Sequence, residues 1–152
     1  MGYHENRMTH EYEGHYRKKH DPNIEPSPTL VKLIRERAKG DRLPCGSAFT
    51  VAEMARVTPS EVGRVADLLE IKITECQLGL FGHKADRRNI VRPAQTVSSQ
   101  LEETLRGRLA NGRLPCESAW DVARHFGMSK LEVTAACEKL GIRLVSCQLG
   151  TF

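Results

Sequence analysis

The chain has 152 residues, of which 39% are hydrophobic and 28% charged, and its formal net charge is +4. This composition is typical of a soluble globular protein, and the absence of a long apolar run or a secretory signal argues against a membrane partner and for a cytoplasmic protein with reduced cysteines. The mild basicity permits nucleic-acid binding without requiring it.

An internal duplication organises the chain. Residues 30–81 align with residues 101–152 without a gap, and matching residues lie 71 positions apart. A unit of about 55 residues buries only about 60% of its unfolded surface, so each copy alone should be marginally stable. We therefore expect two small units packed together, residues 28–92 and 99–152, with a linker at 93–98 and a flexible polar tail at 1–27.

The first helix of each repeat is predicted from helical spacing of leucine and isoleucine, at Leu30 and Ile34 and again at Leu101 and Leu105. A glycine-containing stop follows both runs. A second, short helix is expected after each repeat's Leu-Pro-Cys segment, with a serine as its N-cap. The expected caps are Ser47 and Ser118.

The third helix of each repeat has a clear start signal. Thr58 followed by proline is an N-cap with proline at the first helical position, and Ser129 is the equivalent cap. Apolar residues at helical spacing predict a buried stripe on each helix. In the first repeat the stripe is Val62, Val65, Ala66 and Leu69, and in the second it is Val133, Ala136, Cys137 and Leu140.

A short strand is expected after each third helix, because IKITECQL and IRLVSCQL alternate and are rich in β-branched residues. In the first repeat, a basic turn at 82–89 leads into NIVRP, which could return as a second strand and close a hairpin. The second repeat ends at Phe152 and has no room for such a strand. The expected fold is mainly α with short β-strands.

The second and third helices of each repeat form a predicted helix-turn-helix, clearest in VARHFGMSKLEVTAACEKLGI. The segments GDRLPC and VAEMARVTPSEVGRVADLL, with their counterparts NGRLPC and VARHFGMSKLEVTAACEKL, resemble the GntR-type winged-helix domain over about 40 residues of each repeat. The resemblance implies two tandem winged-helix-like units, the second lacking the return strand of its wing. It also implies that the third helix reads the major groove of double-stranded DNA while the wing contacts the backbone.

Candidate DNA-binding residues follow from that resemblance and from the basic turn. The third helices would contribute Thr58, Ser60, Arg64, Ser129, Lys130 and Thr134. The wing of the first repeat would contribute Lys84, Arg87, Arg88 and Arg92. A cluster of charges on a loop is often only solvated, and helix-turn-helix units also serve as protein-interaction modules. A protein adaptor therefore stays open beside a DNA-binding transcriptional regulator.

Four of the five cysteines form two matched pairs, and each pair is expected to approach across neighbouring strands. Packing as small core residues is one interpretation, and a redox or metal-sensing role is the other. The common structural zinc motif uses closely spaced cysteines, which this sequence lacks. The residues concerned are Cys45, Cys76, Cys116 and Cys147.

Catalytic signatures do not stand out. The sequence shows no Ser-His-Asp grouping, no paired-carboxylate site and no glycine-rich phosphate loop, so we expect neither an enzyme nor a bound cofactor.

Overall fold

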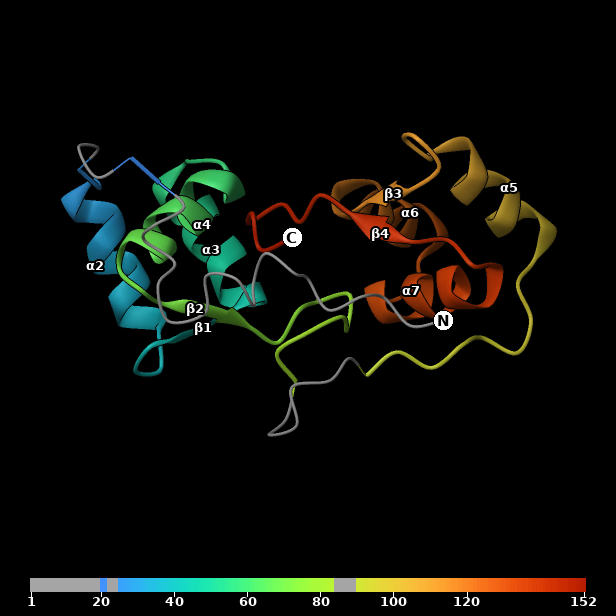
Figure 1. Ribbon diagram of the computed structural model, residues 1–152, viewed down its shortest axis with the longest axis horizontal. Helices are drawn as coiled ribbons and strands as arrows, with labels where there is room; N and C mark the ends of the chain where they lie inside the picture. Colours follow the sequence, from blue (N-terminus) through green and yellow to red (C-terminus); the bar gives the residue numbers. More distant parts are fainter. Residues whose placement is uncertain (1–19, 22–24, 84–89) are drawn as a thin grey trace. The chain divides into compact units, whose positions relative to one another are not determined.

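The computed structural model describes residues 20, 21, 25–83 and 90–152 (Figure 1). They form six helices and four short strands, so the chain is mainly helical, as the sequence predicts. The first repeat contains α2 (Pro28–Arg37), β1 (Arg42–Pro44), α3 (Cys45–Ala55), α4 (Pro59–Leu68) and β2 (Lys72–Thr74). The second contains α5 (Ser99–Gly107), β3 (Leu114–Pro115), α6 (Cys116–Phe126), α7 (Lys130–Leu140) and β4 (Leu144–Val145).

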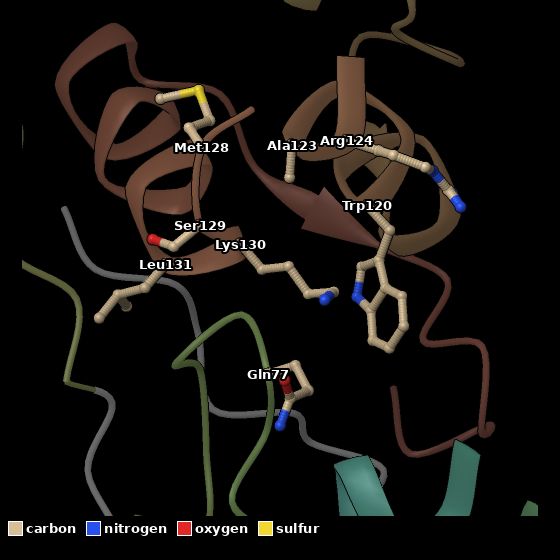
Figure 2. Close-up of a pocket in the computed structure, with 8 residues that line it drawn as sticks. All are labelled: Gln77, Trp120, Ala123, Arg124, Met128, Ser129, Lys130 and Leu131. Carbon is tan, nitrogen blue, oxygen red and sulfur yellow. The ribbon is translucent and has the colours of Figure 1, made fainter. Parts of the chain in front are cut away.

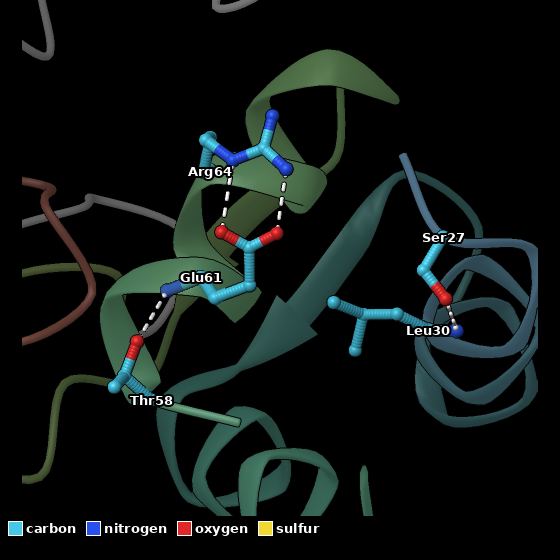
Figure 3. A network of polar contacts seen from close by, with 5 residues as sticks. All are labelled: Ser27, Leu30, Thr58, Glu61 and Arg64. Atoms are coloured by element: carbon cyan, nitrogen blue, oxygen red, sulfur yellow. Dashed lines mark hydrogen bonds and ion pairs between the residues drawn. The ribbon is translucent and has the colours of Figure 1, made fainter. Parts of the chain in front are cut away.

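Serine caps start the first helix of each repeat. The Ser27 hydroxyl accepts a hydrogen bond from the Leu30 amide at 3.5 Å (Figure 3). The Ser98 hydroxyl accepts one from the Leu101 amide at 3.1 Å. These bonds satisfy amides that have no partner within the helix. The predicted first helices are confirmed.

The second helices begin earlier than the serine caps predict. Pro44 and Pro115 are the N-caps of α3 and α6, and neither provides a side-chain cap. Cys45 and Ala48 lie three residues apart and are both buried, so the buried face of α3 extends back to the cysteine. Ser47 therefore lies inside the helix, and the prediction of Ser47 and Ser118 as caps was wrong.

Each repeat contains one two-stranded parallel sheet. Arg42, Leu43 and Pro44 of β1 stand opposite Lys72, Ile73 and Thr74 of β2, and β3 pairs with β4 in the same way. Parallel strands need a long crossover connection, which two helices supply in each repeat. The expected pairing of the strands that flank the second and third helices is confirmed.

The return strand expected at NIVRP is not formed. Residues 90–93 have no strand structure, and one backbone hydrogen bond joins this segment to residues 77–79: the Ile90 amide donates to the Gly79 carbonyl at 2.8 Å. Val91 is buried, which shows that the segment docks through a side chain. Packing of Val91 thus takes the place of the predicted wing hairpin.

The buried stripe of the third helix is confirmed in both repeats. Val62, Val65 and Ala66 are fully buried in α4, while Leu69, just past its end, is half-buried. The equivalent residues of α7 show the same pattern. The third helix of each repeat therefore packs through this apolar face, as its spacing predicts.

The compact units of the fold do not follow the repeat boundaries. The first-repeat unit contains described residues up to Cys76 together with Gln148–Phe152, and the second-repeat unit contains the described part of Gln77–Cys147. The QLG segment after each repeat's last strand thus belongs to the unit built from the other repeat's helices. Leu78 and Leu149, the leucines of these segments, are 0% and 2% exposed.

Both QLG segments pack closely, one through its backbone and the other against side chains. A Cβ atom on Gly63 of α4 would lie 1.8 Å from the carbonyl oxygen of Leu149, so only glycine fits there. In the second-repeat unit, a Cβ atom on Gly79 would lie 2.5 Å from Cδ1 of Leu131. Glu75 and Ser146, which correspond between the repeats, both have positive φ angles just before the chain enters the other unit. A left-handed residue before each segment redirects the chain at the same point of both repeats.

We predict that Gly63→Ala destabilises the protein by about 1–2 kcal/mol, because the added methyl group must displace the Leu149 backbone at a cost that exceeds alanine's helix propensity gain. Gly107→Ala is the matched control, since a Cβ atom there has no neighbour within 4 Å. Urea unfolding followed by far-UV circular dichroism measures both. A Gly63→Ala protein as stable as the control would contradict the docking of residues 148–152 on α4.

Candidate functional site

The helix-turn-helix of each repeat closes through a left-handed residue. Arg56 ends α3 with φ of 56°, and Gly127 ends α6 with φ of 62°. Thr58 then caps α4, its hydroxyl accepting from the Glu61 amide at 3.1 Å (Figure 3). Ser129 and Glu132 form a reciprocal capping box on α7. The predicted starts of both third helices are confirmed.

Arg64, a predicted DNA contact, is held within its own helix. Its Nε and Nη2 atoms donate to the Glu61 carboxylate at 2.9 and 2.5 Å, a bidentate pair that Figure 3 shows. The hydrogen bond to Arg64 lowers the pKa of Glu61, and the same bond raises the pKa of Arg64. The two charges neutralise each other on α4, so Arg64 is committed to Glu61 instead of projecting toward a ligand.

The outer face of α4 is covered as well as its inner face. Leu149 lies against Gly63, and the His20 ring contacts Asp67 with 2.7 Å between Nε2 and Oδ2. Both Gly63 and Asp67 are buried. Thr58 and Ser60, at the start of the helix, are exposed. The structure therefore presents the first turn of α4 to solvent and covers the following turns.

The helix α7 shows the same division between an accessible start and a covered middle. Ser129 is exposed, and the Lys130 ammonium lies 4.3 Å from the centre of the Trp120 ring. Thr134 is 0% exposed, and its hydroxyl donates to the Lys130 carbonyl at 3.0 Å. The Ala94 amide donates to the carbonyl of Ala135. Thr134 is thus a core residue in this structure, contrary to its predicted role as a DNA contact.

The predicted basic wing is only partly within the structure. Lys84, Arg87 and Arg88 lie outside the described residues. Arg92 is exposed, and its Nη1 atom donates to the Val91 carbonyl at 3.2 Å. Arg92 therefore follows a docked segment, and no described strand supports it as part of a wing.

The cysteines are placed mainly as core residues. Cys45, Cys76, Cys116 and Cys137 are buried, Cys147 is half-buried, and no disulfide joins any of the five. The strand pairing brings Cys45 and Cys76 to the same end of one sheet. No group of three or more metal-binding side chains occurs in the part of the chain that the structure describes. Burial favours the packing interpretation for Cys45, Cys76 and Cys116.

We predict that Cys147 is the first cysteine to react with a thiol reagent in the native protein, while the other four react slowly. Burial raises the pKa of Cys137 to about 12, which leaves almost no thiolate at neutral pH. Mass spectrometry of peptides from a labelling time course measures the order. Rapid modification of Cys45 or Cys116 would contradict the packing interpretation and support a redox role.

A comparison of the two repeats identifies surface residues that the helix-turn-helix analysis missed. Most identical positions are buried or half-buried in at least one repeat and are explained by packing. Three identical positions are exposed in both repeats, and all three are arginine. We call them the arginine corner: Arg35, Arg37 and Arg42 in the first repeat, and Arg106, Arg108 and Arg113 in the second.

Each arginine corner is a short stretch of chain around the end of the first helix. Arg35 and Arg37 lie in the last turn of α2. Backbone hydrogen bonds between Lys39 and Arg42, at 2.7 and 3.3 Å, close the tight turn that leads into β1. The equivalent turn in the second repeat joins Ala110 and Arg113. An arginine near a helix C-terminus interacts favourably with the helix dipole. This effect does not account for Arg42 or Arg113, which follow the tight turn after the helix.

A further basic residue stands beside each corner in the parallel sheet. Arg42 is the register partner of Lys72. In the second repeat, the amide of Leu114 donates to the carbonyl of Arg143, which places Arg143 alongside Arg113. Basic side chains at opposing positions repel each other and weaken a sheet.

The ion pairs at the corners are exposed, and they involve only some of the arginines. Arg106 contacts Glu102 at 2.8 Å, Arg108 lies 3.9 Å from Asp121, and Arg42 lies 4.0 Å from Asp41. No ion pair with another described residue involves Arg35, Arg37 or Arg113. Exposed ion pairs contribute little free energy, so an incoming anion can replace them. Both corners can therefore offer guanidinium groups to an anionic ligand.

The chain was compared with protein-family models, with curated proteins and with solved structures, and none of these comparisons found a match. Within the described residues, every helix is too short or too polar to cross a bilayer. The assignment of function therefore depends on the geometry above.

Proposed function

We propose that this chain binds double-stranded DNA through phosphate contacts made by the two arginine corners. The observation that carries the proposal is that arginine occupies every position that is both identical and exposed in the two repeats. Core packing does not require an exposed residue to be the same in both copies. A ligand that contacts both copies in the same way requires the same exposed residue in both.

Arginine suits a phosphate better than lysine does. The guanidinium group presents its N–H donors in a planar fork that matches two phosphate oxygens, whereas an ammonium group acts as a point charge. Two corners on one chain also bind as linked sites, which increases the overall affinity when both engage the same duplex.

The scaffold in this proposal is the tandem helix-turn-helix of the GntR-like resemblance, in a form where the chain after β2 enters the other unit instead of a wing hairpin. Phosphate contacts position a protein on a duplex without reading its sequence. The starts of α4 and α7, with the exposed Thr58, Ser60 and Ser129 and the half-buried Lys130, are the remaining candidates for base contacts. DNA binding of this kind is the first requirement of the transcriptional role expected from the sequence.

A protein-interaction adaptor is the second candidate function. It is favoured by the covered middle of α4 and α7, because a third helix covered by other segments cannot enter a major groove along its length. An adaptor would show no binding to random duplex DNA at moderate salt, so one titration separates the two functions.

We predict that replacing Arg35, Arg37 and Arg42 with glutamine weakens binding to random duplex DNA at least tenfold. The slope of log affinity against log salt concentration should become shallower by about 0.9 for each phosphate that the protein no longer contacts. Fluorescence anisotropy of labelled duplex DNA at several salt concentrations measures both quantities, and circular dichroism checks folding.

The matched control removes three exposed cations that the other repeat lacks: Lys32, Arg56 and Lys139, each replaced by glutamine. Residues 103, 127 and 68 at the equivalent positions are glutamate, glycine and leucine. This variant has the same net charge as the corner variant, so it should keep most of the affinity. Equal losses of affinity in the two variants would show that net charge, and not the arginine corner, determines DNA binding. Absence of DNA binding by the unaltered chain would reject the proposal.

A further inference from the structure

A cavity lies beside the helix-turn-helix of the second-repeat unit. Its volume is about 490 Å³, and its lining includes Gln77, Trp120, Arg124, Met128, Lys130 and Leu131 (Figure 2). This size is within the usual range for small-molecule sites, which are apolar with a few polar groups. All of these residues belong to one compact unit. The cavity is therefore a feature of that unit alone.

The lining combines an aromatic surface with a cation. Figure 2 shows the Trp120 indole and the Lys130 side chain converging on the same space, with the Gln77 amide facing them. The Lys130 ammonium lies over the Trp120 ring, 4.3 Å from its centre, so it covers one ring face, and an anion that draws it away uncovers that face. Met128 and Leu131 provide apolar walls. A planar ring that carries an anionic group matches this combination.

The duplication provides an internal control for the cavity. At the positions of Trp120, Arg124 and Lys130, the first repeat has phenylalanine 49, glutamate 53 and proline 59. The first repeat nevertheless forms the same two helices and the same left-handed turn. The fold therefore does not require tryptophan or these two cations, and this combination of side chains is particular to the second repeat.

A short polar chain connects the cavity to the arginine corner of the same unit. Asp121 contacts Arg124 at 2.6 Å through Oδ1, and its Oδ2 atom lies 3.9 Å from Arg108. Arg108 belongs to the corner, and Arg124 lines the cavity. Asp121 therefore contacts one residue of the corner and one residue of the cavity lining.

We propose that this cavity binds a nucleotide whose phosphate draws the Lys130 ammonium off the Trp120 ring, so that the base can lie against the indole. The proposal rests on the proposed DNA binding and extends it to a second kind of contact. Stacking on an aromatic side chain is the general way in which proteins hold unpaired bases. The nucleotide is either a free mononucleotide or an unpaired nucleotide of a bound strand, since both present the same chemistry.

Trp120 is the single tryptophan of the chain, so its fluorescence reports on the cavity directly. The intact protein is titrated separately with thymidine monophosphate, a five-nucleotide thymidine single strand and inorganic phosphate, with excitation at the red edge of the indole band. We expect saturable quenching by a thymidine ligand and none by phosphate alone. Quenching by the mononucleotide identifies a free nucleotide as the ligand, and quenching by the strand alone identifies an unpaired nucleotide.

Lys130→Gln should raise the half-saturation concentration at least fivefold, while Lys139→Gln, an exposed lysine on the same helix, should leave it unchanged. The comparison uses the midpoint of the titration because loss of the ammonium also changes the unliganded fluorescence. No saturable quenching by either thymidine ligand, or an equal midpoint shift in the two variants, would overturn the proposal. Fluorescence anisotropy with labelled duplex DNA, measured on the same samples, separates the two proposals. If the unaltered protein binds the duplex but shows no quenching, only the nucleotide site is rejected. If it does not bind the duplex, the proposed DNA-binding function is rejected.

Discussion

The contact of the Leu149 backbone with Gly63 is the constraint on which the first-repeat unit depends. One repeat is too short to bury a large core, and the QLG segment of the other repeat adds a fully buried leucine to each unit. At Gly63 the segment passes so close to α4 that no side chain fits beneath it. In the second repeat the equivalent position is Thr134, which is buried in its turn. The middle of both third helices therefore serves packing, and function is left to other surfaces.

The charged residues also differ between the third helices and the rest of the surface. On α4, the Arg64 charge is neutralised by Glu61 through Nε and Nη2, which removes a cation from the helix expected to read DNA. At the end of the first helix, arginines stand exposed in both repeats, and among them only Arg106 makes a close ion pair with another described residue. Because an exposed guanidinium group is stabilised little by its neighbours, it can bind a phosphate without first breaking a strong interaction. The exposed cations that can bind a phosphate therefore lie at the arginine corners and not along the middle of the third helices.

Local features of the fold could be predicted from the sequence. The caps at Thr58 and Ser129 and the buried stripe on each third helix depend on residues within one or two turns, and all are confirmed. The start of α3 was missed because Pro44 and Cys45 carry no side-chain cap, and burial of Cys45 decides the boundary.

The exchanged QLG segments could not be predicted, because a leucine that docks on a distant helix leaves no periodic pattern. The expected wing strand failed for the same reason: Val91 is buried by long-range packing, and its neighbours form no strand. The arginine corner, in contrast, was present in the sequence as three polar identities between the repeats, at 35, 37 and 42 against 106, 108 and 113. Only their exposure in both units separated them from identities kept for packing.

Arginine side-chain NMR tests the central claim most directly, because each Nε–H group gives its own signal and responds to phosphate binding. During titration with a random duplex, the account predicts shifts of the signals of both arginine corners, while the signal of Arg64 stays in place. Shifts of Arg64 and of the α4 backbone amides, with all six corner signals unchanged, would contradict the account and restore the third helix as the DNA-binding element.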